Sequence, residues 1–213
     1  AILREAAAHL ADRKGEITEL LTTEEGKTSG EASGEVQRAI DIFYYYAEKA
    51  RDIGGTVKAS SSQGTTLYTV REPVGVASLI TPWNYPIAIP AWKMAPALAT
   101  GNTVVSKPAT LAPGTAIAIV EALDAAGIPD GVINLVTGPG RSVGDEIVSH
   151  PAVDAVSFTG SCGVGEAVYT DAADKEKRVQ TEMGGKNPTI VAGSADLERA
   201  VDIVGRGAFG VTG

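Results

Sequence analysis

Apolar residues recur at helical spacing in the N-terminal part of the chain. Between residues 2 and 27, and again between 34 and 53, they return every three or four positions, as they do on the buried face of an amphipathic helix. Gly54 and Gly55 follow directly and indicate the end of the second helical segment. We therefore predict two or three helices in this region.

Residues 56–72 change to an extended pattern. Thr56-Val57-Lys58 precedes a turn rich in Ser, Gln and Gly, and residues 67–71 alternate between apolar and polar. Two extended segments joined by such a turn predict a hairpin between the helical part and the rest of the chain.

From Val74 onward, short apolar runs alternate with segments of helical period. The predicted strands are 74–80, 103–106, 132–136 and 154–158, with shorter ones near 178–181 and 188–191. The predicted helices are 87–99, 112–126, 142–149, 163–172 and 196–208. Strands that are apolar throughout are typical of a parallel sheet buried on both faces. The alternation predicts an α/β fold with a doubly wound, Rossmann-like parallel sheet.

Composition excludes several classes of protein. The chain has 213 residues, one cysteine and a formal net charge of −8. One cysteine excludes a disulfide scaffold and favours a reducing compartment, so we expect a cytoplasmic protein. The negative charge disfavours nucleic-acid binding. The sequence contains no run of 18 apolar residues, so we predict no membrane span. We predict no metal site.

Charge is distributed unevenly along the chain. From Pro73 to Val120 the charged residues are Lys93 and Lys107, with no carboxylate among them. A cation in such an apolar stretch loses hydration unless a polar or anionic group meets it. Two interpretations stay open: the lysines meet an anionic ligand, or they extend along apolar surface to reach water.

Ligands of doubly wound sheets bind beyond the carboxyl ends of the strands. The first predicted strand ends in Thr81-Pro82-Trp83-Asn84-Tyr85-Pro86. The Asn84 amide could hold a developing oxyanion or cap the next helix.

The other strand ends carry further candidate residues. Lys107 follows the second strand, at a position where folds that prefer an unphosphorylated ribose carry an acidic residue. Residues 138–144 nearly match G-x-G-x-x-G, although a plain turn explains them equally well. Small residues at 159–165 open a helix whose backbone amides could meet an anion. Glu182 precedes two glycines and could be a general base or a solvated side chain.

Taken together, these segments resemble the NAD(P)-dependent aldehyde dehydrogenase family. The residues that carry the resemblance are P-W-N-Y-P (82–86), A-P-A-L-A-T-G-N-T-V-V-S-K-P (95–108), F-T-G-S (158–161) and E-M-G-G-K-N-P (182–188). They occur in the family's order and spacing, and the resemblance covers nearly the whole chain.

The resemblance implies roles for individual residues. Asn84 would donate to the oxyanion of a thiohemiacetal, Glu182 would activate the thiol or the deacylating water, and Lys93 would share a proton path with Glu182. The implied cofactor-binding residues are Ile80, Thr81, Pro82, Trp83, Lys107, Thr110, Gly140, Gly144, Phe158, Thr159, Gly160, Ser161, Val164, Met183 and Gly184. Lys107 would bind the adenosine ribose, and Thr110 stands where strictly NAD-dependent members carry a glutamate. The expected cofactor is therefore NADP or NAD.

The resemblance also implies a domain division. Residues 1–54 and 74–184 would form the cofactor-binding domain, 55–73 part of an oligomerisation arm, and 185–213 the start of a catalytic domain. The complete enzyme would be a homodimer or homotetramer that oxidises an aldehyde, with a small semialdehyde as one candidate. The family's nucleophilic cysteine would lie about three residues beyond Gly213, so the chain resembles a fragment.

The resemblance implies that Cys162 does not replace that nucleophile, because its position in the motif belongs to the family's cofactor site. Two other functions stay open at this point. One is a non-catalytic nucleotide-binding fragment. The other is a phosphate-dependent reductase of the same fold, although Glu182 argues against it because release to phosphate needs no water-activating base.

Overall fold

The computed structural model describes residues 1–210. Helices α1 (Ile2–Asp12) and α2 (Lys14–Glu25) divide the first predicted helical segment at Arg13. Helix α3 (Ser29–Lys49) begins earlier than the apolar pattern predicted, because Thr28 and Glu31 form a reciprocal capping box at its start. It also ends before Gly54, so the glycine pair is not the stop that we predicted.

A parallel sheet forms the centre of the described chain. Its strands are β3 (Val76–Ile80), β4 (Thr103–Lys107), β5 (Ile133–Leu135), β6 (Ala155–Gly160) and β7 (Arg178–Met183). Within residues 1–210 their spatial order is β5-β4-β3-β6-β7. Strands β4 and β5 thus lie on one side of β3, and the chain then crosses to place β6 and β7 on the other side of β3. This reversal is the topological switch point at which doubly wound folds bind ligands.

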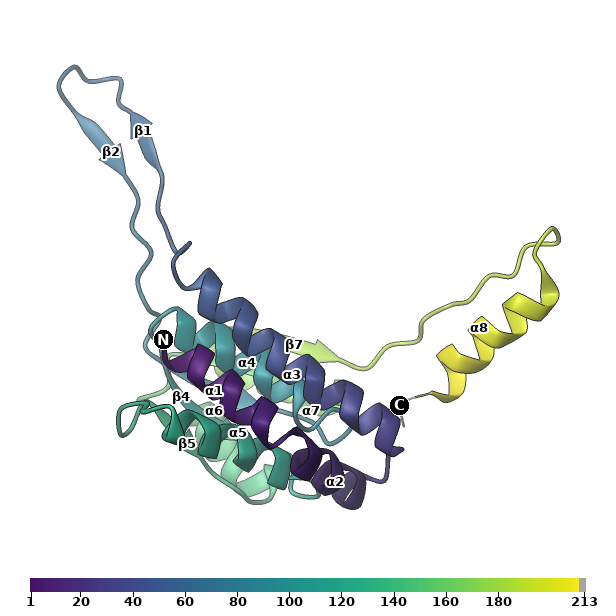
Figure 1. Ribbon diagram of the computed structural model, residues 1–213. Coiled ribbons are helices and arrows are strands. Elements are labelled where there is room, and N and C mark those ends of the chain that lie inside the picture. Colours follow the sequence, from purple (N-terminus) through teal and green to yellow (C-terminus); the bar gives the residue numbers. More distant parts are fainter. Residues whose placement is uncertain (211–213) are drawn as a thin grey trace.

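Helices cover both faces of the sheet (Figure 1). They are α4 (Ala88–Ala99), α5 (Gly114–Ala125), α6 (Asp145–Ser149), which a π-type turn at Gly140–Gly144 precedes, and α7 (Cys162–Asp174). Leu79 packs into the cluster formed with α1, α3, α4 and α5, whereas its neighbour Ile80 packs into the cluster with α6 and α7. Because successive strand residues point to opposite faces, β3 is buried on both sides, as predicted.

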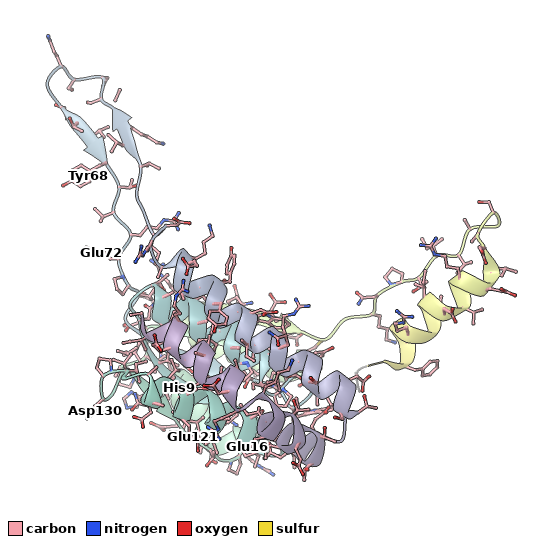
Figure 2. All side chains as sticks on the ribbon, viewed as in Figure 1. His9, Glu16, Tyr68, Glu72, Glu121 and Asp130 are labelled. Carbon is pink, nitrogen blue, oxygen red and sulfur yellow. The ribbon has the colours of Figure 1, made fainter. Side chains whose placement is uncertain are left out.

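The predicted hairpin is present as an arm. Strands β1 (Val57–Ala59) and β2 (Thr66–Tyr68) pair antiparallel and project from the body of the molecule (Figure 1). Tyr68 lies on this arm, far from the helices, and is 71% exposed (Figure 2).

The C-terminal part corrects one prediction. Residues 188–191 form no strand in the described chain, and helix α8 (Leu197–Phe209) follows them away from the body (Figure 1). A strand requires a neighbour for its backbone hydrogen bonds, and no described element lies beside this segment in the sheet. Pro188 also lacks an amide hydrogen to donate. The apolar run was therefore not sufficient to predict a strand.

No helix in residues 1–210 is both long and apolar enough to cross a membrane.

Candidate active site

A cleft of about 1240 Å³ lies at the carboxyl ends of β3, β6 and β7. It brings together nearly all the site residues predicted from the sequence. The predicted residues that line it are Ile80, Thr81, Pro82, Trp83, Asn84, Lys93, Lys107, Gly140, Phe158, Thr159, Gly160, Ser161, Val164, Glu182, Met183 and Gly184. Thr110 and Gly144 are the predicted residues outside the lining. The cleft thus corresponds to the switch point of the sheet.

Asn84 reaches this cleft on the loop that connects β3 to α4. Its side chain is half-buried between Pro82 and Pro86. The interpretation of Asn84 as the cap of the next helix is not needed, because Glu35 from α3 accepts the Ile87 and Ala88 amides, each at 3.1 Å. Sequence reasoning missed Glu35, since nothing in its local pattern indicates a partner 52 residues later.

A chain of hydrogen bonds connects Lys93 with Glu182. The Lys93 Nζ donates to Ser157 Oγ at 2.7 Å, and Ser157 Oγ donates to Gln180 Oε1 at 2.7 Å. Gln180 Nε2 then donates to Glu182 Oε1 at 2.8 Å. Burial lowers the pKa of Lys93 to about 8, and the negative charge of Glu182 opposes this change. The amine is therefore far easier to deprotonate than an ordinary lysine.

Ser157 and Gln180 are functional candidates that sequence reasoning missed. They are register partners on the neighbouring strands β6 and β7. The period of two along β7 places Gln180 and Glu182 on one face of the sheet. That alternation was the available signal, but it becomes informative only once the pairing of β6 with β7 is known.

Lys107 lies at the end of β4 and is buried. Its Nζ donates to the carbonyl oxygen of Pro108 at 2.8 Å, and burial lowers its pKa. Thr110 lies nearby on the exposed surface and donates its hydroxyl to the Gly138 carbonyl at 3.0 Å. The hydroxyl thus ties the loop after β4 to the loop after β5.

The start of α7 forms the anion-binding part of the cleft. Ser161 is the N-cap residue, and in the described chain its side chain does not bond the first-turn amides. Those amides are thus open to an anionic ligand. A Cβ on Gly160 would lie 2.5 Å from the Phe158 ring, so the close packing here requires glycine. Cys162 Sγ lies beside this helix start and donates to the Gly184 carbonyl at 3.1 Å.

These features fit a dinucleotide. Free helix amides suit a pyrophosphate, and the buried Lys107 suits a ribose hydroxyl as a donor. The hydroxyl of Thr81 is also buried in the cleft without a hydrogen-bond partner among residues 1–210, and a ligand would satisfy it. The described chain holds no group of three His, Cys, Asp or Glu side chains suited to a metal ion.

Comparison with known proteins agrees with this geometry. The family model described as "Aldehyde dehydrogenase family" matches residues 1–213. The chain belongs to the aldehyde dehydrogenase family. It is 66% identical over 212 residues to α-ketoglutarate semialdehyde dehydrogenase of Haloferax volcanii, and 47% identical over 214 residues to 2,5-dioxopentanoate dehydrogenase of Saccharolobus solfataricus. Both matches cover all of this chain but only 44% and 45% of the relatives.

Solved aldehyde dehydrogenases share the fold. Betaine aldehyde dehydrogenase of Staphylococcus aureus in complex with NAD+ is 40% identical, with a TM-score of 0.92 over 94% of this chain and 40% of that one. The NAD-dependent aldehyde dehydrogenase of Sinorhizobium meliloti is 39% identical, with a TM-score of 0.94 over 97% of this chain and 41% of that one. The predicted family and the doubly wound α/β fold are therefore confirmed. This chain spans less than half the length of these aldehyde dehydrogenases.

Proposed function

We propose that this chain supplies the cofactor site, the oxyanion donor and the general base of an NAD(P)-dependent aldehyde dehydrogenase. The observation that carries the proposal is the joint position of Asn84 and Glu182 on one cleft, with a hydrogen-bonded path from Glu182 to Lys93. The proposed substrate is α-ketoglutarate semialdehyde, also called 2,5-dioxopentanoate. The names of relatives with 66% and 47% identity support this choice.

Each proposed role follows from a side chain's chemistry. The Asn84 amide donates to the oxygen that becomes negative when a nucleophile adds to the aldehyde. Glu182 accepts a proton from the nucleophile or from the water that releases the acid. Gln180 donates to Glu182 and, with Ser157 and Lys93, orients its carboxylate.

The cofactor has a proposed place along the same cleft. The first turn of α7 holds the pyrophosphate, Lys107 binds the adenosine ribose, and Met183 with Gly184 lies beside the nicotinamide. NAD(P)+, when bound, accepts the hydride from the substrate. We place the nucleophilic cysteine in the longer protein beyond this chain, because Cys162 lies at the anion-binding helix start and its thiol donates a hydrogen bond to the Gly184 carbonyl.

The assembly and location are part of the same proposal. The projecting arm, with Val57, Leu67 and Tyr68 exposed, supports a homodimer or homotetramer in which 55–73 bridge subunits. Residues 1–54 and 74–184 then form the cofactor-binding domain, and 185–213 begin the catalytic domain. The single cysteine supports a cytoplasmic location.

Kinetics of the longer protein test the proposal. With 2,5-dioxopentanoate as substrate, Asn84→Ala should lower kcat by about 10²–10³, the usual loss for one oxyanion donor. Glu182→Gln should leave a burst of reduced cofactor followed by slow turnover, because release of the acid needs the base. An unchanged steady-state rate in Glu182→Gln removes that residue from the mechanism. Cofactor binding without oxidation of any aldehyde would instead favour a non-catalytic nucleotide-binding protein.

A further inference from the structure

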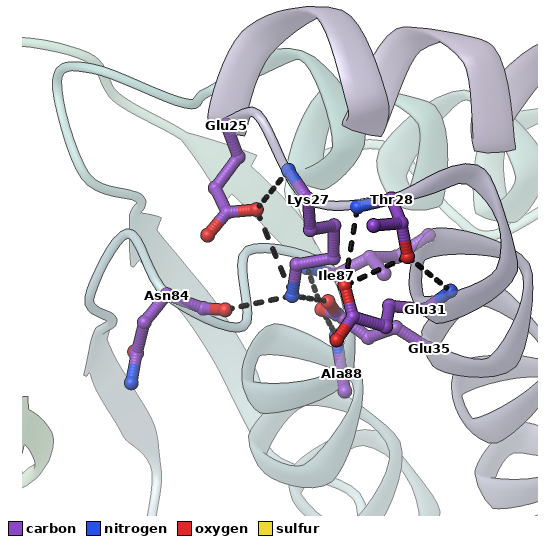
Figure 3. A network of polar contacts seen from close by, with 8 residues as sticks. All are labelled: Glu25, Lys27, Thr28, Glu31, Glu35, Asn84, Ile87 and Ala88. Atoms are coloured by element: carbon purple, nitrogen blue, oxygen red, sulfur yellow. Dashed lines mark hydrogen bonds and ion pairs between the residues drawn. The ribbon is translucent and has the colours of Figure 1, made fainter. Parts of the chain in front are cut away.

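A buried ammonium group lies directly behind the Asn84 loop. Lys27, in the linker between α2 and α3, has a side chain that is 0% exposed. Its Nζ lies 2.5 Å from Glu35 Oε2 and 3.8 Å from Glu25 Oε2 (Figure 3). It also donates to the backbone carbonyl of Asn84 at 2.9 Å and lies 4.5 Å from the centre of the Tyr85 ring.

Glu35 connects the same ammonium with the start of α4. One carboxylate oxygen accepts from Lys27, and the other accepts from the amides of Ile87 and Ala88 (Figure 3). Helix α4 begins without a side-chain cap from its own N-cap residue in the described chain. Glu35 therefore provides this cap from another helix, and both of its oxygens have partners.

The two contacts fix the backbone at Asn84 and just after it. Lys27 anchors the carbonyl of Asn84 itself, and Glu35 anchors the backbone three residues later. Pro82 and Pro86 set only their own φ angles and restrict the residues that precede them. The orientation of Asn84 thus depends on an anchor outside the loop.

We propose that Lys27 and Glu35 are positioning residues that hold Asn84 in the orientation needed to donate to the substrate oxyanion. This inference rests on the proposed role of Asn84. A buried ion pair is not the most stable way to fill such space, because apolar side chains of similar volume often serve stability equally well. An ammonium, however, can bind a chosen backbone carbonyl, which an apolar side chain cannot do. Oxyanion stabilisation in turn depends on a donor whose position is fixed in advance.

A double-mutant cycle in the longer protein tests the proposal. Lys27→Met, Asn84→Ala and the double variant are compared for kcat with 2,5-dioxopentanoate, for cofactor Kd by fluorescence titration, and for folding by near-UV circular dichroism. Lys27→Met should lower kcat by about tenfold to a hundredfold, as small displacements of catalytic groups do, and leave the cofactor Kd within about twofold. The double variant should be no slower than Asn84→Ala alone, because Lys27 acts through Asn84.

Lys14→Met is the matched control, since Lys14 also bonds α3, through Gln37 at 2.8 Å, but does not contact the loop. It should leave kcat unchanged. Glu35→Gln keeps an oxygen acceptor for the α4 amides and enters the same cycle if Lys27→Met fails to fold.

Three outcomes overturn the proposal. The first is a folded Lys27→Met enzyme with unchanged kcat. The second is a Lys27→Met substitution that lowers kcat by the same factor in the Asn84→Ala background as in the wild type. The third is a failure of both Lys27→Met and Glu35→Gln to fold, which would assign the pair to folding alone. An unchanged kcat in Asn84→Ala itself is a distinct result, because it rejects the proposed role of Asn84 before Lys27 is considered.

Discussion

Lys93 carries its charge on a partly buried side chain that lines the cleft. Burial lowers its pKa from 10.5 to about 8 despite the opposing charge of Glu182. Below pH 8 the amine is protonated in both the folded and the unfolded state. Between about pH 8 and 10.5 the folded protein has released this proton and the unfolded chain has not, so raising the pH through that window favours folding.

This difference predicts a pH-dependent effect of Lys93→Met on stability. The variant lacks the titrating amine, so its advantage in Tm over the wild type should shrink between pH 8 and 10. Thermal unfolding of both proteins at pH 7.5, 8.5 and 9.5 measures it. A Tm difference that is constant over this range would contradict the lowered pKa of Lys93.

Thr110 is the residue on which we base a prediction of the cofactor choice. A glutamate at this position would repel a 2′-phosphate, at a cost of about 4 kcal/mol for like charges about 4 Å apart near a protein surface. Thr110 is neutral, and the cation of Lys107 remains in the cleft. We therefore predict that the longer protein accepts NADP at least as well as NAD.

The charge argument also predicts the effect of Thr110→Glu, which should weaken NADP binding far more than NAD binding. Titration of both cofactors against wild type and variant measures this. Thr110→Val is the control, because it removes the hydrogen bond from the Thr110 hydroxyl to the Gly138 carbonyl without adding a charge. Equal weakening of both cofactors by Thr110→Glu, or a wild-type preference for NAD above about tenfold, would reject the assignment.

Single residues also mark the limit of what sequence reasoning could reach. Asn84, Glu182 and Lys93 were predicted because each lies in or beside a recognisable segment. Ser157 and Gln180 were missed because their contact depends on the pairing of β6 with β7. Lys27 and Glu35 were missed for a similar reason, since their partners Asn84 and Ile87 are more than fifty residues away in the chain.

At the scale of the elements, packing at the end of β6 depends on the absence of a side chain. A Cβ on Gly160 would lie 2.5 Å from Cζ and 3.2 Å from Cε1 of Phe158, and this ring is only 4% exposed. Because the ring is enclosed, Gly160→Ala should destabilise the protein by about 1–3 kcal/mol, as overpacked cores do.

Gly163→Ala is the control for this prediction. Among the described residues nothing lies within 4 Å of a Cβ at Gly163, and alanine favours a helix over glycine by about 1 kcal/mol. In urea unfolding of the longer protein, Gly160→Ala should therefore have a lower midpoint than the wild type. The midpoint of Gly163→Ala should equal that of the wild type or exceed it. A Gly160→Ala midpoint at the wild-type value would show that the ring can move.

Element prediction succeeded where the pattern determined the structure and failed where a partner was required. The five strands of the described sheet and the helices between them were predicted within a few residues. The apolar runs of β3 and β4 indicated strands buried inside the sheet. The start of α3 was misplaced because the Thr28–Glu31 capping box, not an apolar residue, begins the helix. The strand at 188–191 was wrong because apolar character alone supplies no neighbouring strand.

At the scale of the whole molecule, the two ends of the cleft differ in how fully the described chain builds them. The anion-binding side has its helix amides, Gly160 and Lys107 in place. Beyond Gly184 the chain extends away to α8, whose apolar residues Leu197, Val201 and Phe209 are 69%, 69% and 90% exposed. Such a surface is typical of one that another part of a protein covers.

We therefore predict that the isolated 213-residue chain oxidises no aldehyde. Acyl transfer of this kind requires an activated nucleophile, and the one cysteine of the chain, Cys162, lies at the anion-binding start of α7 with its thiol bonded to Gly184. Purified chain incubated with NAD+ or NADP+ and 2,5-dioxopentanoate should form no reduced cofactor at 340 nm, and Cys162→Ser should behave identically. The longer protein, assayed beside it, is the positive control, and there Cys162→Ser should retain turnover. Reduction of cofactor by the isolated chain, abolished by Cys162→Ser, would instead make Cys162 the nucleophile and overturn the placement of the catalytic cysteine beyond Gly213.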